Sequence, residues 1–465
     1  MPTLQLTSEE ESMVGGEAGP AAQLAARLVV RMAGIMGADR LVPIAAAHVD
    51  GCLYHGPVST DFARKLVDGG GQVRVPTTLN VGSVDLLHPE LYRGDAETAK
   101  AGRELMRLYA ALGCRATWTC APYQLQQRPS FGQHVAWAES NAIVFANSVL
   151  GARTERYGDF IDIAAALIGR APYAGLHRDE GRFARVVFRL QGVTPALAES
   201  DVLFAALGHL IGRRAGGEVA AIDGLTYATE DQLKALGAAA ASSGSCAMFH
   251  VIGVTPEAPT LEAACGGALG TGGAGATSGV GAAGGGSADA DLRSGESPSK
   301  TPSTRSGNIA PRIVELTVDD LAAAARELSS AAGDNETLGA ISVGTPHFSI
   351  KEFEQLVTFL DGRRVSDRVE FFVSTGRDVL TQVTANGWLD DLTHAGVRIV
   401  TDTCTYITPI LTGRPGAVMT NSAKWAWYAP NNLGLRVIFG SLRECVESAV
   451  RGEVWRDASL WRRTE

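Results

Sequence analysis

The chain has 465 residues, of which 45% are hydrophobic and 20% charged, and its formal net charge is −9. This length is sufficient for two or three domains with a large buried core. The negative charge argues against non-specific binding to nucleic acid, although a local pocket can still attract a small anion. No apolar run reaches the roughly 18–20 residues of a membrane helix. We therefore expect a soluble globular protein that binds neither nucleic acid nor a membrane.

The beginning of the chain and its cysteines favour a cytoplasmic protein. Residues 7–11 contain three consecutive glutamates and resemble the acidic start of a helix, so we do not expect a signal peptide. The seven cysteines are odd in number and include no C-x-x-C pair, which argues against a disulfide framework and against a zinc ribbon. Scattered cysteines in a cytosolic protein are more often ligands or nucleophiles.

Helix and strand patterns alternate along the first half of the chain. In chain order, apolar spacing predicts a helix over residues 21–36, strands over 41–47 and 74–80, a helix over 97–112, a strand over 116–120 and a helix over 141–150. Polar residues follow several of these strands. Because α/β folds bind their ligands at the ends of strands, we expect a site there.

A change in composition interrupts the chain at residues 266–308, which are rich in Gly, Ser, Ala and Thr. Such a segment cannot bury enough apolar surface to become ordered. The alternative of a phosphate-binding loop is disfavoured, because the segment is too long and contains no GxxxxGK[ST] motif. We therefore predict a disordered insertion between two parts of a catalytic region, residues 1–265 and 309–465.

The alternation continues after the insertion. The pattern predicts a helix over residues 316–329, a strand over 338–343, a helix over 349–360, a strand over 369–374, a helix over 379–386 and a strand over 398–401. Ser349 followed by Glu352 fits a capping box at the start of the second of these helices. Strands that alternate with helices predict an α/β fold with parallel sheets.

Nine short motifs, in this order, resemble the aconitase X family, the divergent branch of the aconitase superfamily. They lie at residues 6–10, 48–52, 76–80, 119–123, 136–141, 145–154, 344–349, 401–404 and 420–424. Each motif alone is weak, but nine in order are specific, and the match covers nearly everything except the insertion. The resemblance implies three-layer α/β/α units with mainly parallel sheets and the activity of an iron–sulfur hydro-lyase.

The resemblance also implies a substrate and a partner. Bacterial members resemble cis-3-hydroxy-L-proline dehydratases, which form Δ1-pyrroline-2-carboxylate, whereas archaeal members dehydrate mevalonate 5-phosphate. The superfamily carries a small swivelling domain, fused or as a separate subunit, and no stretch of this chain resembles it. We therefore expect a small-subunit partner and a small hydroxy acid as substrate. A non-catalytic scaffold or regulatory subunit is the alternative of another class, and the presence of Cys120 and Cys404 argues against it.

The resemblance implies that Cys120 and Cys404 are ligands of an iron–sulfur cluster, since thiolates are its usual ligands. The third ligand stays open. The archaeal relatives have cysteine where this chain has Thr345, which argues against the phosphomevalonate activity. Cys52 is the best substitute, in a loop after a predicted strand, and His347 is a lesser candidate. An iron atom with an open coordination position could assist the departing hydroxide.

Dehydration of a hydroxy acid further needs a proton acceptor and a clamp on the carboxylate. Lys424 can pair with a substrate carboxylate, and Ser140 could donate a hydrogen bond to it. Glu139 could accept the proton or hold a substrate amine, or it could only orient another residue. The complete prediction comprises the catalytic residues Glu139, Ser140 and Lys424, and the substrate-binding residues Gly51, Leu53, Asn80, Glu139, Ser140, Asn421, Ser422 and Lys424.

Overall fold

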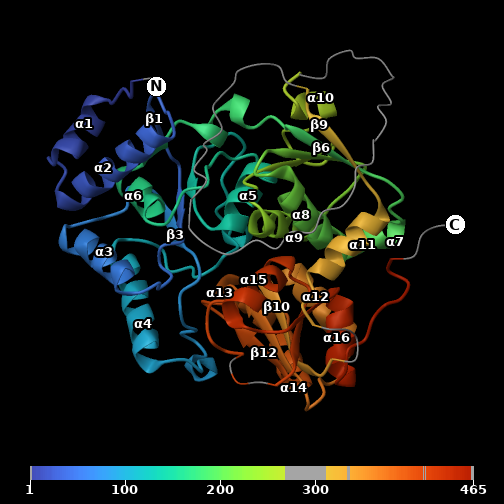
Figure 1. Ribbon diagram of the computed structural model, residues 1–465. Helices are drawn as coiled ribbons and strands as arrows, with labels where there is room; N and C mark the ends of the chain where they lie inside the picture. Colours follow the sequence, from blue (N-terminus) through green and yellow to red (C-terminus); the bar gives the residue numbers. More distant parts are fainter. Residues whose placement is uncertain (1–2, 268–309, 332–335, 412, 414, 462–465) are drawn as a thin grey trace, which may run out of the picture.

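The computed structural model describes residues 3–267, 310–331, 336–411, 413 and 415–461. Within these residues, three sheets of parallel strands lie side by side, each with its own helices (Figure 1). The predicted α/β fold with mainly parallel sheets is therefore confirmed. The predicted disordered insertion at 266–308 lies outside the described residues, apart from Gly266 and Gly267.

The first region, residues 3–180, surrounds a parallel sheet in which β2 lies between β3 and β4. Its strands are β1 (Leu41–Pro43), β2 (Ala47–Val49), β3 (Thr77–Leu79), β4 (Ala136–Trp137) and β5 (Arg170–Pro172), of which β1 and β5 form an antiparallel pair. Its helices are α1 (Ser8–Gly15), α2 (Pro20–Ile35), α3 (Pro57–Asp68), α4 (Ala96–Ala111), α5 (Ser140–Ser148) and α6 (Ile161–Ile168). The first four of these helices and α6 share one apolar core with the sheet.

The second region is a four-stranded parallel sheet in the order β8-β7-β6-β9. Its strands are β6 (Val186–Leu190), β7 (Ala220–Asp223), β8 (Phe249–Val251) and β9 (Arg312–Leu316), and its helices are α7 (Pro195–Glu199), α8 (Asp201–Ala215), α9 (Glu230–Ser243), α10 (Leu261–Ala264) and α11 (Val318–Glu327). Strand β9 follows the insertion, yet it pairs with β6, which precedes it. This sheet is therefore built from both sides of the division that the sequence predicts at residues 266–308.

The third region is a five-stranded parallel sheet in the order β12-β11-β10-β13-β14. Its strands are β10 (Leu338–Phe348), β11 (Glu370–Thr375), β12 (Val397–Val400), β13 (Ala417–Thr420) and β14 (Val437–Phe439), and its helices are α12 (Ile350–Leu360), α13 (Arg377–Ala385), α14 (Trp388–Ala395), α15 (Ala423–Leu433) and α16 (Leu442–Arg451). Side chains alternate along each strand: Phe371 and Val373 pack in the core with α12 and α16, while Phe372 packs in the core with α15. This alternation gives the region three layers.

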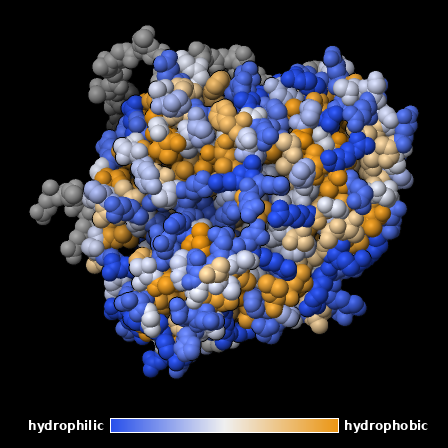
Figure 2. All heavy atoms as spheres, turned by 180° about the vertical axis from the view of Figure 1, so that it is seen from behind, coloured by the Kyte–Doolittle hydropathy of each residue, from blue (hydrophilic) through white to orange (hydrophobic). Residues whose placement is uncertain are grey.

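The second and third regions share an apolar core, which contains Phe188 and Phe249 of one sheet together with Phe372 and Trp425. Helix α9 also contacts α5 of the first region and α15 of the third region. The segments that begin α5 and α15 are consequently brought to the centre of the molecule, where the three regions meet. Seen from behind, the surface carries hydrophobic patches scattered among hydrophilic ones (Figure 2). Within the described ranges, no helix is long and apolar enough to span a membrane.

Candidate functional site

The beginnings of helices α5 and α15 meet through Lys424 and Glu139. Glu139 caps α5, Lys424 is the second residue of α15, and their side chains form an ion pair that is 12% exposed at the lysine and 6% at the glutamate. Lys424 Nζ also donates to Ser140 Oγ at 3.2 Å. Burial alone would lower the pKa of Lys424, but the charge and hydrogen bond of Glu139 together with the charge of Cys120 outweigh the burial, and the pKa is raised. The lysine therefore stays cationic in a largely dry site.

Glu139 uses its two carboxylate oxygens differently. Oε2 accepts the backbone N–H groups of Asn141 at 2.9 Å and Ala142 at 3.0 Å, together with the side-chain amide of Asn141. Oε1 accepts Lys424 Nζ and the Ser140 hydroxyl, the latter at 3.1 Å. The backbone of Glu139 has φ 70°, a conformation that costs energy for a residue other than glycine. Helix capping by Oε2 helps to offset that cost and fixes the side chain.

Two of the predicted ligands, Cys120 and Cys404, come together beside this ion pair. They are 5% and 4% exposed, and each thiol interacts electrostatically with Lys424. Burial raises the pKa of both thiols. The nearby Glu139 and Cys404 add to the rise for Cys120, whereas the charge of Lys424 opposes it for both cysteines. The backbone N–H of His347 donates to Cys120 Sγ at 3.2 Å.

His347 ties together the two segments that carry these cysteines. Its Nε2 bonds the carbonyl oxygen of Thr403 at 3.0 Å, and its Nδ1 bonds the hydroxyl of Thr119 at 3.1 Å. Burial lowers the pKa of His347 to about 4, so the ring is neutral, with the proton on Nε2 facing the carbonyl. Both ring nitrogens are thus engaged by protein groups, which is the geometry of a positioning residue rather than of a metal ligand.

Thr345, at the position where the archaeal resemblance has cysteine, lies beside Cys404. It is 5% exposed, and its Oγ1 has no hydrogen-bond partner of normal geometry among the described residues. The same hydroxyl lies close enough to the thiol of Cys404 to oppose the rise of its pKa. Two buried thiols and one unsatisfied hydroxyl therefore converge on one small volume.

Cys52, the other predicted ligand, is not brought to this pair. Its thiol donates to the carbonyl oxygens of Val49 at 3.6 Å and Asn80 at 3.4 Å, and its electrostatic neighbours are Asp50, Asp162 and Cys114. The loop that contains it is tightly packed, since a side chain at Gly51 would come within 2.6 Å of the Tyr109 hydroxyl. Leu53 donates its N–H to the carbonyl oxygen of Asp50 at 3.2 Å. In the described part of the chain, no group of three His, Cys, Asp or Glu side chains could hold a metal ion.

Asn80 contacts a residue that sequence reasoning did not single out. Asn80 follows β3 and Asp50 follows the neighbouring β2, and the Asn80 amide donates to the Asp50 carboxylate. Burial raises the pKa of Asp50 to about 7, and the charge of Glu139 adds to the effect. Asp50 lies within one of the nine motifs. The available signal was its place directly after a strand that pairs with the strand before Asn80.

Ser422 and Asn421 make local contacts. The Ser422 hydroxyl accepts the N–H of Trp425 at 3.0 Å, which caps α15, and donates to the carbonyl oxygen of Thr345. The Asn421 amide donates to Asp201 at 3.1 Å. Both residues line a pocket beside Lys424 whose wall also includes residues from α9 and from the end of β10. Ser422 thus links the start of α15 to the Thr345 backbone, while the side chain of Asn421 is directed to α8.

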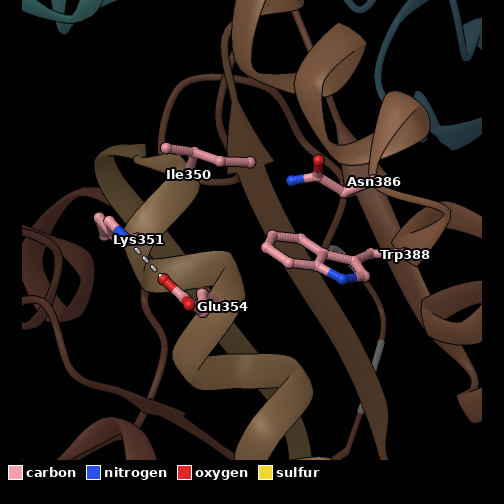
Figure 3. A pocket seen from close by; sticks show the side chains of 5 residues that line it. All are labelled: Ile350, Lys351, Glu354, Asn386 and Trp388. Atoms are coloured by element: carbon pink, nitrogen blue, oxygen red, sulfur yellow. Dashed lines mark hydrogen bonds and ion pairs between the residues drawn. The ribbon is translucent and has the colours of Figure 1, made fainter.

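A second, more open pocket of about 380 Å³ lies on the third region (Figure 3). Ile350, Asn386 and Trp388 line it, together with the Lys351–Glu354 ion pair at 2.8 Å. None of the predicted site residues contributes to this pocket. The buried centre around Lys424 is therefore the candidate active site.

Comparisons with known proteins identify the family of this chain. Family models match this chain as the aconitase X first domain at residues 3–180, second domain at 184–271 and third domain at 338–451. A cis-3-hydroxy-L-proline dehydratase from Pseudomonas aeruginosa is 41% identical over 98% of this chain and 72% of its own length. One from Hypocrea jecorina is 37% identical over 97% of this chain and 69% of its own length.

More distant relatives match over a similar span. A phosphomevalonate dehydratase large subunit from Methanosarcina mazei is 32% identical over 97% of this chain and 98% of its own length. Among solved structures, the holo-form of aconitase X from Thermococcus kodakaraensis aligns with a TM-score of 0.78 and 30% identity, covering 96% of this chain and all of that one. The chain therefore belongs to the aconitase X family.

Proposed function

We propose that this protein is a hydro-lyase that dehydrates cis-3-hydroxy-L-proline to Δ1-pyrroline-2-carboxylate. The observation that carries the proposal is the buried ion pair of Lys424 with Glu139, next to Ser140 and the two thiols Cys120 and Cys404. The substrate is chosen because the relatives with that name are 41% and 37% identical to this chain, against 28–33% for the phosphomevalonate dehydratase large subunits.

The two oxygens of Glu139 suggest how the residues divide the reaction. Lys424 and Ser140 both contact Oε1, and both are suited to binding the substrate carboxylate. When the substrate recruits these two donors, Oε1 loses its partners and becomes free to accept the proton from the α-carbon. Oε2, held by the start of α5, keeps the side chain in place. Loss of the C3 hydroxide then leaves an enamine, which tautomerises to the cyclic imine.

The side chains beside Glu139 provide some of the ligands that an iron–sulfur cofactor needs. Cys120 and Cys404 would hold it, and the unsatisfied hydroxyl of Thr345 faces the same volume. When bound, an iron atom with an open position supplies Lewis-acid assistance to the departing hydroxide. Cys52 is turned into the core of the first region, so we do not retain it as the third ligand.

We further propose that the protein acts with a small swivelling subunit in the cytoplasm. The support for a partner is that the M. mazei relative is named a large subunit. All seven cysteines are free and buried, as is usual for a reducing compartment.

The test is the formation of Δ1-pyrroline-2-carboxylate from cis-3-hydroxy-L-proline by anaerobically purified, iron-reconstituted protein. We expect turnover when the small subunit from the same organism is present and little without it. Mevalonate 5-phosphate serves as the competing substrate, and we expect no product from it. Iron-loaded protein with its partner that dehydrates only mevalonate 5-phosphate, or neither compound, would contradict the proposal.

A further inference from the structure

The carboxyl ends of β2 and β3 place a partly buried carboxylate next to a buried amide. The two strands are parallel, and Val49 pairs with Leu79, so the residues that follow them, Asp50 and Asn80, meet at one edge of the sheet. The Asn80 amide nitrogen donates to the Asp50 carboxylate.

Among the described residues, the charged neighbours of Asp50 are all anionic. The charged groups that act on it are Glu139, Asp159 and Asp162. Throughout the described ranges, no Lys, Arg or His side chain forms an ion pair with Asp50, and Asn80 is the one group that donates to its carboxylate. Asp162 is itself occupied with the backbone N–H groups of Asp50 at 2.7 Å and Gly51 at 3.3 Å. A partly buried carboxylate that has only negative charges around it favours a cationic partner.

Asn80 supplies a second, independent indication of a ligand. It is 3% exposed, and its Oδ1 has no hydrogen-bond partner in the described structure. A buried acceptor without a donor is costly, and native structures rarely tolerate one unless a ligand or water completes it. A donor to Oδ1 can also reach the Asp50 carboxylate, because the nitrogen of the same amide group is bonded to that carboxylate.

We propose that Asp50 and Asn80 bind the secondary ammonium group of the substrate. Such a group carries one positive charge and two N–H bonds, one for the Asp50 carboxylate and one for Asn80 Oδ1. Lys424 would hold the carboxylate end of the same molecule, with Glu139 between the two subsites, since Glu139 pairs with Lys424 and also acts on Asp50. The site then selects zwitterionic amino acids over hydroxy acids that lack nitrogen. A metal ion fits less well, because no third ligating side chain accompanies the carboxylate.

This inference rests on the proposed function, and a pair of non-reacting probes tests it separately. L-Proline and (S)-tetrahydrofuran-2-carboxylate share the ring and the carboxylate, but the second has an oxygen in place of the ammonium. We expect calorimetry on the reconstituted protein with its partner to show about tenfold or tighter binding of L-proline, the gain typical of a charged hydrogen bond. Asp50→Asn should remove most of this preference by weakening L-proline alone.

Asp159→Asn is the matched control. It also removes a negative charge near Asp50, but Asp159 is exposed and makes no contact with the Asn80 amide. It should keep the preference. Should Asp50→Asn fail to fold, Asn80→Ala replaces it and should likewise weaken L-proline but not the oxygen analogue. A preference that survives in these variants, or a wild-type protein that binds both probes equally or binds neither, would overturn the inference.

The two proposals can fail separately. Protein that prefers L-proline through Asp50 but leaves cis-3-hydroxy-L-proline unchanged refutes the proposed reaction and supports the ammonium subsite. Conversely, normal dehydration together with an unchanged probe preference in Asp50→Asn refutes the subsite alone.

Discussion

Cys120 and Cys404 are the residues on which the cofactor assignment depends. They are separated by most of the chain and yet share one buried volume, which His347 secures by bonding Thr119 and Thr403, the neighbours of the two cysteines. A thiolate ligand needs a nearby positive charge or a metal to offset its burial. Lys424 is present for this purpose, although Glu139 already neutralises most of its charge.

Replacing Cys404 by Ala should therefore abolish cofactor binding while preserving the fold. Iron per protein after anaerobic reconstitution is expected to fall below about a tenth of the wild-type value, whereas loss of one buried thiol should cost only about 1 kcal/mol of stability. Iron content and visible absorption measure the first effect, and urea unfolding measures the second.

Cys246→Ala is the matched control for this variant. Its thiol is equally buried but donates to the Met248 carbonyl oxygen in the second region, away from the site. It should bind iron normally. Wild-type iron content in Cys404→Ala would remove Cys404 from the ligand set.

At the scale of single residues, sequence motifs located the site but not every role within it. Glu139, Lys424, Cys120 and Cys404 were identified from short motifs, and the structure brings them together. Cys52 shows that a motif does not determine where a side chain points, because its thiol points into the core. Asp50, two residues earlier, could be recognised only when the pairing of β2 with β3 was known.

At the scale of elements, periodicity predicted the helices well and the irregular segments poorly. Helices α2, α4 and α12 lie where apolar spacing placed them. The strand predicted over 116–120 is wrong: this segment runs beside β3, with Thr119 N–H bonded to the carbonyl oxygen of Leu79, but Trp118 has φ 45° and interrupts the ladder. A left-handed tryptophan cannot be anticipated from apolar pattern, since the tertiary contacts impose it.

Arg182 connects several elements and should be one of the most important residues for stability. It is 2% exposed and pairs with Glu257, and it donates to carbonyl oxygens of Asn147, Ala152 and Leu176. Arg182→Met would leave a carboxylate and three carbonyl groups without their donor. We expect a loss of about 3–5 kcal/mol in the free energy of unfolding, as for other buried pairs that lose one partner.

Urea denaturation of Arg182→Met and of Arg189→Met provides the comparison. Arg189 is 41% exposed and its contacts to Asp223 and Glu315 are surface pairs, so its replacement should cost less than about 1 kcal/mol. Equal losses of unfolding free energy in the two variants would show that the Arg182 bonds do not stabilise the contact between the first and second regions.

At the scale of the whole molecule, the site exists because three regions meet. The first region contributes Glu139, the second contributes Lys234 to the pocket wall, and the third contributes Lys424. Parallel sheets gather polar residues at their carboxyl ends, so each region alone presents part of the site. The class of each sheet could be predicted from alternating patterns, but the packing between sheets depends on long-range contacts such as those of α9 with α5 and α15.

The stability of the whole molecule towards acid depends on opposing buried groups. Burial lowers the pKa of His177 from 6.5 to about 3, so the unfolded chain takes up a proton below pH 6.5 that the native protein refuses. The stability contributed by neutral His177 is complete above pH 6.5 and is lost as the pH falls towards 3. Burial raises the pKa of Asp162 to about 6, and this group gains stability as the pH falls over part of the same range. The pH dependence of the free energy of unfolding is therefore the sum of these two opposing contributions.

The contribution of His177 can be isolated by comparing the free energies of unfolding of the wild type and a His177 variant. His177→Gln should be less stable than wild type at pH 7, because His134 and Tyr157 lose their buried partner. Since the variant has no histidine to protonate, the gap should narrow by about 2 kcal/mol between pH 6.5 and pH 5, at about 1.36 kcal/mol for each pH unit. Urea unfolding at several pH values measures it, with the exposed His394→Gln as the control that keeps the wild-type slope. A gap that stays constant or widens on acidification would mean that His177 is protonated in the native protein, and its bonds to His134 and Tyr157 would then have to be assigned to the charged ring.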